Sequence, residues 1–167
     1  MTALNCSVLT VSDSRSIEED TSGALLQELI TTDGHQVVDR SLVRDDVYQI
    51  RSVVSAWIAD EAVQVILSTG GTGFTGRDST PEALLPLFDK TIDGFGELFR
   101  QVSFEEIGAS TIQSRSLGGL ANGTLIFALP GSSNAVRTAW ERILSPQLNS
   151  ATGPCNFVEL LPRFRES

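Results

Sequence analysis

The pattern of apolar and polar positions divides the chain into short strand-like segments that alternate with longer segments of helical spacing. Strands are expected in four segments, at residues 6–11, 36–43, 63–68 and 124–129. Apolar side chains recur at helical spacing in three further segments, at residues 21–32, 46–60 and 135–144. A short helix over residues 81–88 and a helix that begins near Gly94 complete the pattern. Strands that alternate with helices in this way predict a mostly parallel sheet with helices on both faces.

One pair of strands breaks this alternation. The segment "RSLGGLANGTLIFALP" predicts a hairpin that turns at Asn122–Gly123, since this dipeptide suits a type I′ turn. In open α/β sheets, ligands bind beyond the carboxyl ends of the strands. The loops that follow strands should therefore gather on one rim, and they are 12–23, 44–46, 69–80 and 130–134. No repeat or linker interrupts the pattern, so residues 1–167 are expected to form a single domain.

The charge of the chain narrows the range of partners. It carries 12 Lys and Arg against 21 Asp and Glu, a formal net charge of −9, which argues against nucleic acid and membrane partners. No apolar run approaches the roughly 20 residues of a membrane span, and no secretory signal is recognised, so a cytoplasmic location is expected. A single histidine excludes a multi-histidine metal site within one chain. An anionic ligand would depend on backbone amides, a few arginines and Mg²⁺.

The stretch "STGGTGFTGRDSTPEALL" carries four glycines in nine residues. Glycines concentrate where the backbone needs φ > 0 or where amides must face an anion, so residues 70–73 are candidates for a phosphate-binding nest. The alternative is a plain helix-entry loop, capped by Thr80 or by a capping box of Ser79 and Glu82. Both caps leave Asp78 without a structural role, which favours a functional one.

Other polar groups on the expected rim are weak signals when each is taken alone. Asp45 and Asp46 begin the second expected helix, and because one of them can cap it, the other could face the rim. Asp45 and Asp78 would suit Mg²⁺ on a polyphosphate, which takes one or two carboxylates plus phosphate oxygens. Two solvated acids are the alternative. Asp20 is a candidate cap for the first expected helix, and Arg115 is one of few cations available to an anionic ligand.

Several motifs, in this order, resemble those of the molybdenum cofactor biosynthesis proteins of the MoaB and MogA type: "VLTVSDSR", "EDTSG", "STGGTGFTGRDSTPEAL", "DGFGELFR", "SRSLGG" and "LPGSSNAVRTAWE". The resemblance runs from about Val8 to the end of the chain, and "PLFDKTIDGFGELFRQVSFEEIG" with the "PCNF" tail is more similar to the MoaB branch. It implies a three-layer α/β/α fold with a mostly parallel sheet and one antiparallel edge strand. It also implies a homo-oligomer, either a trimer or a hexamer.

The resemblance further implies binding of molybdopterin, a pyranopterin with a dithiolene and a terminal phosphate. Active members of the family transfer AMP from Mg·ATP to that phosphate and release pyrophosphate. Matched position by position, the resemblance implies catalytic and Mg²⁺-binding roles for Asp45 and Asp78. It implies substrate binding by the other matched positions: Ser12, Asp13, Asp20, Ser22, Gly23, Gly70, Gly71, Thr72, Gly73, Glu97, Ser114, Pro130, Gly131 and Ser132. Arg44 stands where the family often has proline, so whether Asp45 or Asp46 faces the site is left open.

Three alternatives to an adenylyltransferase are left open. A non-catalytic protein of the same pathway would bind molybdopterin or a precursor without transferring AMP, and retention of Asp78 argues against it. A hydrolase of nucleotide sugars or pyridine nucleotides, similar to competence-damage-inducible proteins, usually has leucine where this chain has Thr72. A purely structural assembly protein would have no need of the polar rim.

Overall fold

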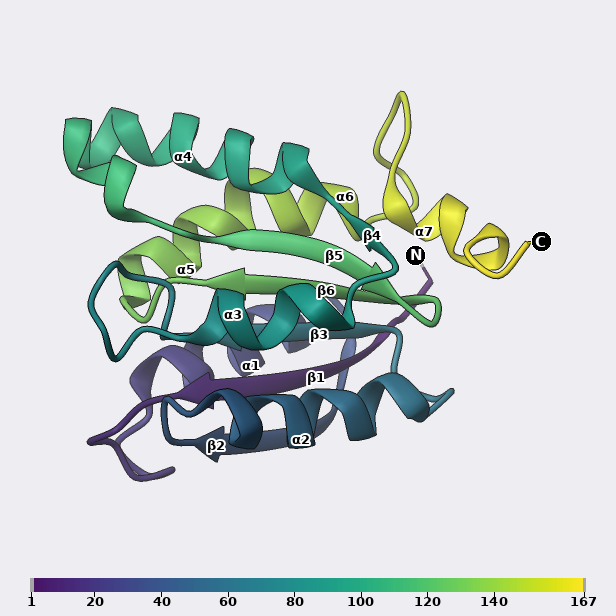
Figure 1. Cartoon of the computed structure of the whole chain (residues 1–167). Helices are drawn as coiled ribbons and strands as arrows, with labels where there is room; N and C mark the ends of the chain where they lie inside the picture. The colour runs from purple at the N-terminus through teal and green to yellow at the C-terminus, as the bar shows by residue number, and fades with distance from the viewer. Residues whose placement is uncertain (1, 167) are drawn as a thin grey trace.

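A single six-stranded sheet organises the protein, and the computed structural model describes residues 2–166 (Figure 1). The strands lie in the order β2–β1–β3–β6–β5–β4. Their bounds are β1 (Asn5–Val11), β2 (Gln36–Val43), β3 (Val65–Thr69), β4 (Lys90–Thr91), β5 (Leu117–Ala121) and β6 (Thr124–Leu129). The first four in spatial order are parallel, whereas β5 runs antiparallel to β6 and β4. The expected fold class is confirmed, and the short β4, which the sequence did not indicate, lies outside the antiparallel strand.

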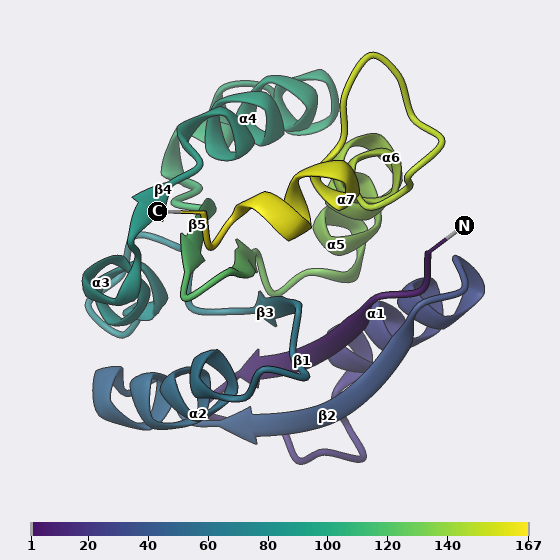
Figure 2. The same cartoon turned by 90° about the vertical axis from the view of Figure 1, so that its right-hand side faces the viewer.

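Helices cover both faces of the sheet and form the outer two layers (Figure 2). α2 and α3 pack on one face, and α1, α4 and α5 pack on the other. The helices are α1 (Thr21–Thr32), α2 (Val47–Ala59), α3 (Thr80–Leu84), α4 (Asp93–Ile107), α5 (Ser133–Ala139), α6 (Ser145–Gln147) and α7 (Phe157–Leu160). A π-helical turn at 140–144 joins α5 to α6. The helices expected from apolar spacing are confirmed, with boundaries shifted by a few residues.

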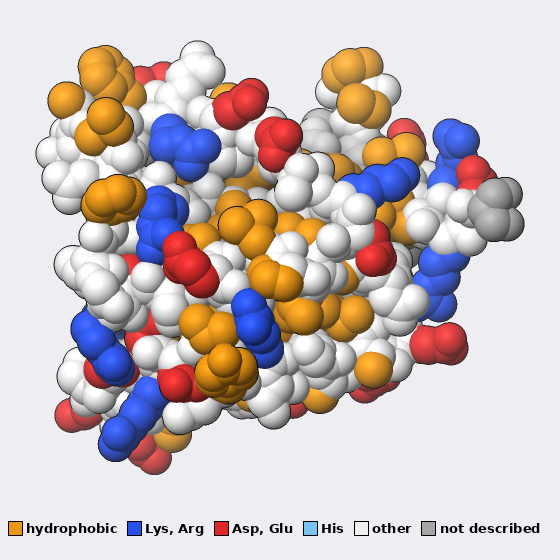
Figure 3. Space-filling model, viewed as in Figure 1, with side chains coloured by type: hydrophobic (Ala, Val, Ile, Leu, Met, Phe, Trp, Pro, Cys, Tyr) orange, Lys and Arg blue, Asp and Glu red, His pale blue; other side chains and the backbone are white. Residues whose placement is uncertain are grey.

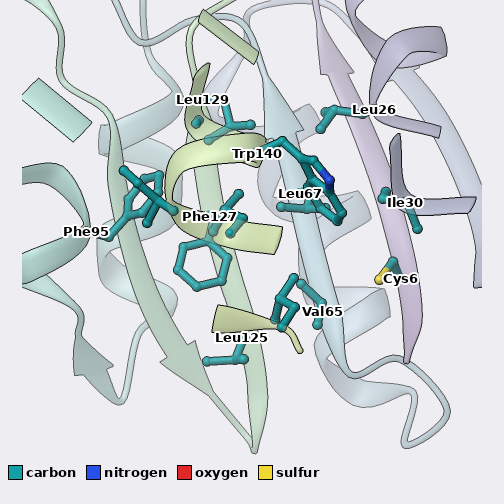
Figure 4. Packing of buried hydrophobic residues seen from close by; sticks show 14 of the residues in the cluster. Cys6, Leu26, Ile30, Val65, Leu67, Phe95, Leu125, Phe127, Leu129 and Trp140 are labelled. Carbon is teal, nitrogen blue, oxygen red and sulfur yellow. The ribbon is translucent and has the colours of Figure 1, made fainter. Parts of the chain in front are cut away.

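Successive residues of the central strands point to opposite faces of the sheet, and both faces are buried. Val65 and Leu67 of β3 face the layer of α1, α4 and α5, while Ile66 between them faces α2 and α3. On the face that α1, α4 and α5 cover, the side chains of Phe127 of β6 and Trp140 after α5 are both buried (Figure 4). This double burial is typical of parallel central strands and explains the continuous apolar run that precedes the glycine-rich stretch.

Local sequence signals set most of the element boundaries. The hairpin between β5 and β6 turns at Asn122–Gly123, where both φ values are positive, as the type I′ preference predicts. Asp20 caps α1 and Asp46 caps α2, each by accepting from amides of the first turn. The caps expected for α3 are wrong. Thr80 is its first helical residue, and Ser79 before it makes no side-chain capping bond.

The tail after α6 folds back onto its own chain. α7 places Phe157 against the core, with its ring centroid 5.9 Å from that of Phe127. Val158, on the same helix, is buried. Within residues 2–166, no helix combines the length and the apolarity that crossing a bilayer requires.

Candidate functional site

A cavity of about 650 Å³ opens at the carboxyl ends of β1, β3 and β6, where the arrowheads of β1 and β6 point in Figure 1. Residues from three of the expected rim loops, 12–23, 69–80 and 130–134, line it. α4 and α5 form a further wall. A volume of this size suits a small-molecule ligand. The prediction that these loops share one site is confirmed, and the loop at 44–46 is the exception, because none of its residues lines the cavity.

Two glycines let the chain turn sharply between β3 and the cavity. Gly70 and Gly71 have φ of 101° and 69°, in the left-handed region that other residues rarely adopt. A side chain at Gly70 would also collide with the carbonyl of Val11. Thr80 ties the turn down, because its hydroxyl donates to Gly70 O at 2.8 Å and its amide donates to Gly71 O at 3.0 Å. The glycine loop, residues 69–80, is thus anchored at the rim.

Asp78 stands on the cavity wall with its charge supported by the loop itself. Its Oδ2 accepts from the amide of Thr75 at 2.9 Å and from the Thr75 hydroxyl at 2.7 Å. Burial alone would raise the pKa of Asp78, but these bonds, the amide of Gly73 and the charge of Arg115 together lower it. The carboxylate is therefore ionised at neutral pH. Asp78 takes no part in capping α3, but the expectation that it lacks a structural role is wrong, because its bonds with Thr75 hold the glycine loop.

The Arg115 side chain is hydrogen-bonded to the backbone of the glycine loop, so it is not a free cation for a ligand. Its Nε donates to Gly73 O at 2.7 Å, and its Nη2 donates to Asp78 O at 2.8 Å. Its own amide donates to Thr72 O at 2.8 Å. An ion pair with Glu82 holds the guanidinium in place. Because its donors are engaged by backbone carbonyls and this carboxylate, Arg115 positions the loop.

Asp45 supports the glycine loop from outside the cavity lining. Since Asp46 caps α2, the Asp45 carboxylate is free of that role. Asp45 Oδ1 instead accepts from the amide of Ser79 at 3.0 Å and from the Ser79 hydroxyl. Its Oδ2 faces Gly71, 2.7 Å from the place that a Cβ would take there. Asp45, not Asp46, therefore borders the loop, and it does so through the residue that follows Asp78.

Asp20 and Gly23 make contacts within the fold and do not line the cavity, and the substrate-binding role expected for them stays a prediction. The buried carboxylate of Asp20 accepts from the Thr10 hydroxyl at 2.5 Å and from the Gly23 amide at 2.9 Å. It also pairs with Arg40 Nη2 at 3.0 Å. A Cβ on Gly23 would collide with Asp20 and Thr10, so this residue is small for a packing reason. These contacts tie β1, α1 and β2 together.

Two further matched acids are not brought to the cavity. Asp13 makes two hydrogen bonds with the guanidinium of Arg77, at 2.9 and 3.0 Å, and this pair is exposed. Glu97 lies on α4 at a separate cavity of about 250 Å³, which Asp93 and Arg100 also line. Neither acid lines the main cavity, so the binding roles expected for Asp13 and Glu97 stay predictions.

The remaining matched substrate-binding residues do meet in the main cavity with Asp78. They are Ser12, Ser22, Gly70, Gly71, Thr72, Gly73, Ser114, Pro130, Gly131 and Ser132. Ser132 also caps α5, because its hydroxyl accepts from the amide of Ala135 at 3.2 Å. This convergence is what parallel strands with a shared carboxyl edge predict.

Sequence reasoning missed the wall that α4 and α5 contribute. Phe99, Ser103 and Glu106 of α4 line the cavity together with Thr138 of α5. The α4 residues are three or four positions apart, and that spacing could have shown that they share one face of the helix. Glu106 accepts from the Thr138 hydroxyl and from Asn134 Nδ2, both at 2.7 Å. These bonds lower the pKa of Glu106, so it is ionised at neutral pH.

Known proteins resemble the chain over most of its length. The family profile described as "Probable molybdopterin binding domain" matches residues 7–150. Molybdenum cofactor biosynthesis protein B of Escherichia coli K12 is 59% identical over 150 residues, which cover 90% of this chain and 88% of that protein. A crystal structure of a molybdenum cofactor biosynthesis protein B has a TM-score of 0.85 at 45% identity and covers 88% of this chain and 92% of that one. The tungsten cofactor synthesizing protein MoaB from Pyrococcus furiosus has a TM-score of 0.82 at 35% identity and covers 99% of both chains.

Proposed function

Because the chain belongs to the MoaB-type molybdenum cofactor biosynthesis proteins, we propose that its main cavity binds molybdopterin and promotes transfer of AMP from Mg·ATP to the molybdopterin phosphate. One observation carries this proposal. Asp78 is an ionised carboxylate on the cavity wall, beside the backbone of Gly70–Gly73. Loop amides favour phosphate oxygens, and an acid beside them favours a cation that arrives with those phosphates.

In the proposed reaction, an oxygen of the molybdopterin phosphate attacks the α-phosphorus of ATP. A new P–O bond forms, the bond to the bridging β-phosphate oxygen breaks, and its electron pair leaves with pyrophosphate. The phosphate monoester is itself the nucleophile, so no side-chain nucleophile is needed. The contribution of the chain would be in-line positioning of the two reactants and compensation of their negative charge.

The carboxylates near the glycine loop fit a Mg²⁺ ion that enters with ATP. Among residues 2–166, no group of three or more His, Cys, Asp and Glu side chains is arranged to hold a metal ion. A nucleotide-bound Mg²⁺ needs only one or two carboxylates, because phosphates and water supply its other ligands. Asp78 would supply the first. Oδ2 of Asp45, which accepts no hydrogen bond from the described residues, would supply the second. The ion would offset the charge on the phosphates.

The position of Asp45 also supports a second candidate, a protein that binds molybdopterin without transferring AMP. Oδ1 of Asp45 is engaged by Ser79, and Asp45 does not line the cavity. If this arrangement persists with ligands bound, only Asp78 would reach the ion. Molybdopterin would then still bind, but charge compensation at the α-phosphate would be too weak for transfer.

One assay separates the two candidates. Purified protein is mixed with authentic molybdopterin, ATP and Mg²⁺, and pyrophosphate release is followed together with pterin fluorescence. Release that requires all three components supports adenylyl transfer. Tight pterin binding without release supports the non-catalytic candidate. Absence of both binding and release would contradict the proposed function altogether.

We also propose that the chain forms a homo-oligomer, either a trimer or a hexamer. Apolar side chains gather where α4 ends, at the upper left of Figure 3. Phe104 and Ile112 in this region are each more than half exposed. Exposed apolar clusters of this kind mark interaction surfaces. Light scattering at micromolar concentration should give three or six times the chain mass, and a monomer would contradict the proposal.

A further inference from the structure

Glu106 is a feature of the main cavity that the proposed reaction does not use. It lies on the wall formed by α4 and α5 and is, with Asp78, one of two carboxylates in the cavity lining. Thr138 Oγ1 donates to its Oε1 and Asn134 Nδ2 donates to its Oε2, both at 2.7 Å. Each carboxylate oxygen has about two lone-pair sites, so each can accept one more bond. Glu106 therefore offers the cavity two oriented acceptors and no donor.

The Glu106 carboxylate on the cavity wall restricts which groups of a ligand can lie beside it. The chain already carries a net charge of −9, and the ligands of the proposed function are themselves anionic. Among the described residues, no Lys or Arg forms an ion pair with Glu106. A phosphate against this wall would be repelled by the carboxylate. The part of the ligand that lies here must instead bring hydrogen-bond donors.

We propose that Glu106 recognises the pterin ring of the ligand, an inference that rests on the proposed function. Its two oxygens accept from the 2-amino group and the neighbouring N3–H of the 2-amino-4-oxopyrimidine edge. That edge presents two parallel donors, which match a carboxylate, whereas adenine presents one donor beside an acceptor nitrogen. Phe99 and Ile107 on the same wall offer apolar surface to the ring. Glu106 thus determines specificity, assigning the pterin to the α4–α5 wall and leaving the glycine loop to the phosphates.

The test compares two ligands that differ only at the recognised edge. Neopterin 3′-phosphate and the matching lumazine, which has oxygen in place of the 2-amino group, are each titrated calorimetrically into wild-type protein and into Glu106→Gln. The wild type should prefer the pterin by about 10- to 100-fold, the loss expected when a charge-assisted hydrogen bond is removed. In Glu106→Gln the preference should fall below about threefold, through weaker binding of the pterin.

GMP carries the same donor edge on a purine and tests whether the edge alone is recognised. We expect it to bind more weakly than neopterin 3′-phosphate. If GMP binds more tightly, and Glu106→Gln removes that advantage, the assignment to a pterin is overturned in favour of a guanine nucleotide.

Glu105→Gln is the matched control. Glu105 is the neighbouring residue on α4, pairs with Arg142 Nη1 at 3.0 Å and does not line the cavity. This variant should keep the wild-type preference. If Glu106 only tethers α4 to α5, Glu106→Gln will weaken both ligands equally and leave their ratio unchanged. That result overturns the inference and leaves the proposed function standing. A wild type that binds neither the pterin nor the lumazine contradicts the proposed function itself, and the inference fails with it.

Discussion

The loop after β1 and the glycine loop after β3 both carry aspartates near the carboxyl edge of the sheet, but they use them differently. Asp20 of the first loop turns inward and is 2% exposed. Its donors come from three separate elements and include the side chain of Arg40. Asp78 takes donors from its own loop and stays on the cavity wall. An aspartate thus becomes part of the fold when donors from distant segments reach it, and it remains available at a surface when its donors come from its own loop.

The largest effect is expected from removing the inward-facing carboxylate. Asp20→Ala leaves Arg40 without its partner and α1 without its cap, so the free energy of unfolding should fall by about 3 kcal/mol. This is the lower end for a buried ion pair, because the Arg40 side chain is 22% exposed and can rehydrate. Urea unfolding at a fixed protein concentration, followed by tryptophan fluorescence, measures the change. A loss below about 1 kcal/mol, typical of surface pairs, would remove the contrast between the two loops.

For Asp78, on the cavity wall, we expect a loss of activity with little change in stability. Asp78→Asn keeps an acceptor for Thr75, so the midpoint of thermal unfolding should stay close to that of the wild type. Pyrophosphate release should fall by at least ~10²-fold, because a charge that stabilises the transition state is lost. Glu61→Gln, which removes the same charge from an exposed position away from the cavity, is the control. Near-wild-type turnover in Asp78→Asn would show that this carboxylate has no role in transfer.

The pH dependence of stability should also separate Asp20 from an ordinary surface acid. Burial alone would raise the pKa of Asp20, but hydrogen bonds from Thr10, Gly23 and Arg40 lower it below the ordinary value. Its stabilising contribution is therefore complete above the unfolded pKa of about 3.9 and is lost as the pH falls through the lower folded pKa. The difference in unfolding free energy between wild type and Asp20→Asn should be constant near neutrality and shrink in acid. A difference that instead grew in acid would contradict the assigned direction.

The smallest effect is expected at Asp13, which bridges the two loops at the surface. Its pair with Arg77 is exposed, and exposed ion pairs contribute little in water. Asp13→Asn should leave the midpoint of thermal unfolding within experimental error and pyrophosphate release within about threefold of the wild type. A loss comparable to that of Asp78→Asn would mean that the bridge, and not the cavity wall alone, sets the position of the glycine loop.

Sequence patterns predicted most of the fold because the signals involved are local. The apolar run before the glycine loop marked β3, and the Asn122–Gly123 pair marked the hairpin. β4 was missed because Lys90–Thr91 is two exposed residues long and has no periodicity of its own. The capping prediction for α3 failed for a different reason. The amide and hydroxyl of Ser79 donate to the carboxylate of Asp45, which is distant in sequence, so the Ser79 side chain is engaged away from the helix.

Motif matching located the loops of the site but could not assign a task to each acid within them. Asp20 and Glu97 match the family motifs as well as Asp78 does, yet only Asp78 lines the main cavity. Glu106 belongs to no matched motif, and it reaches the cavity because α4 packs beside α5.

Most of the strands and helices, the bends at glycine and the position of three loops at one edge of the sheet could be predicted from the amino-acid sequence. Periodicity and turn chemistry are properties of short segments, and the alternation of strands with helices along the chain implies a mostly parallel sheet. Which carboxylates line the cavity follows from the tertiary structure alone, since it depends on donors from other parts of the chain. Asp20 is buried in an ion pair with Arg40. Asp45 lies beside the glycine loop because it accepts from Ser79, and Glu106 is held on the cavity wall by the hydroxyl of Thr138.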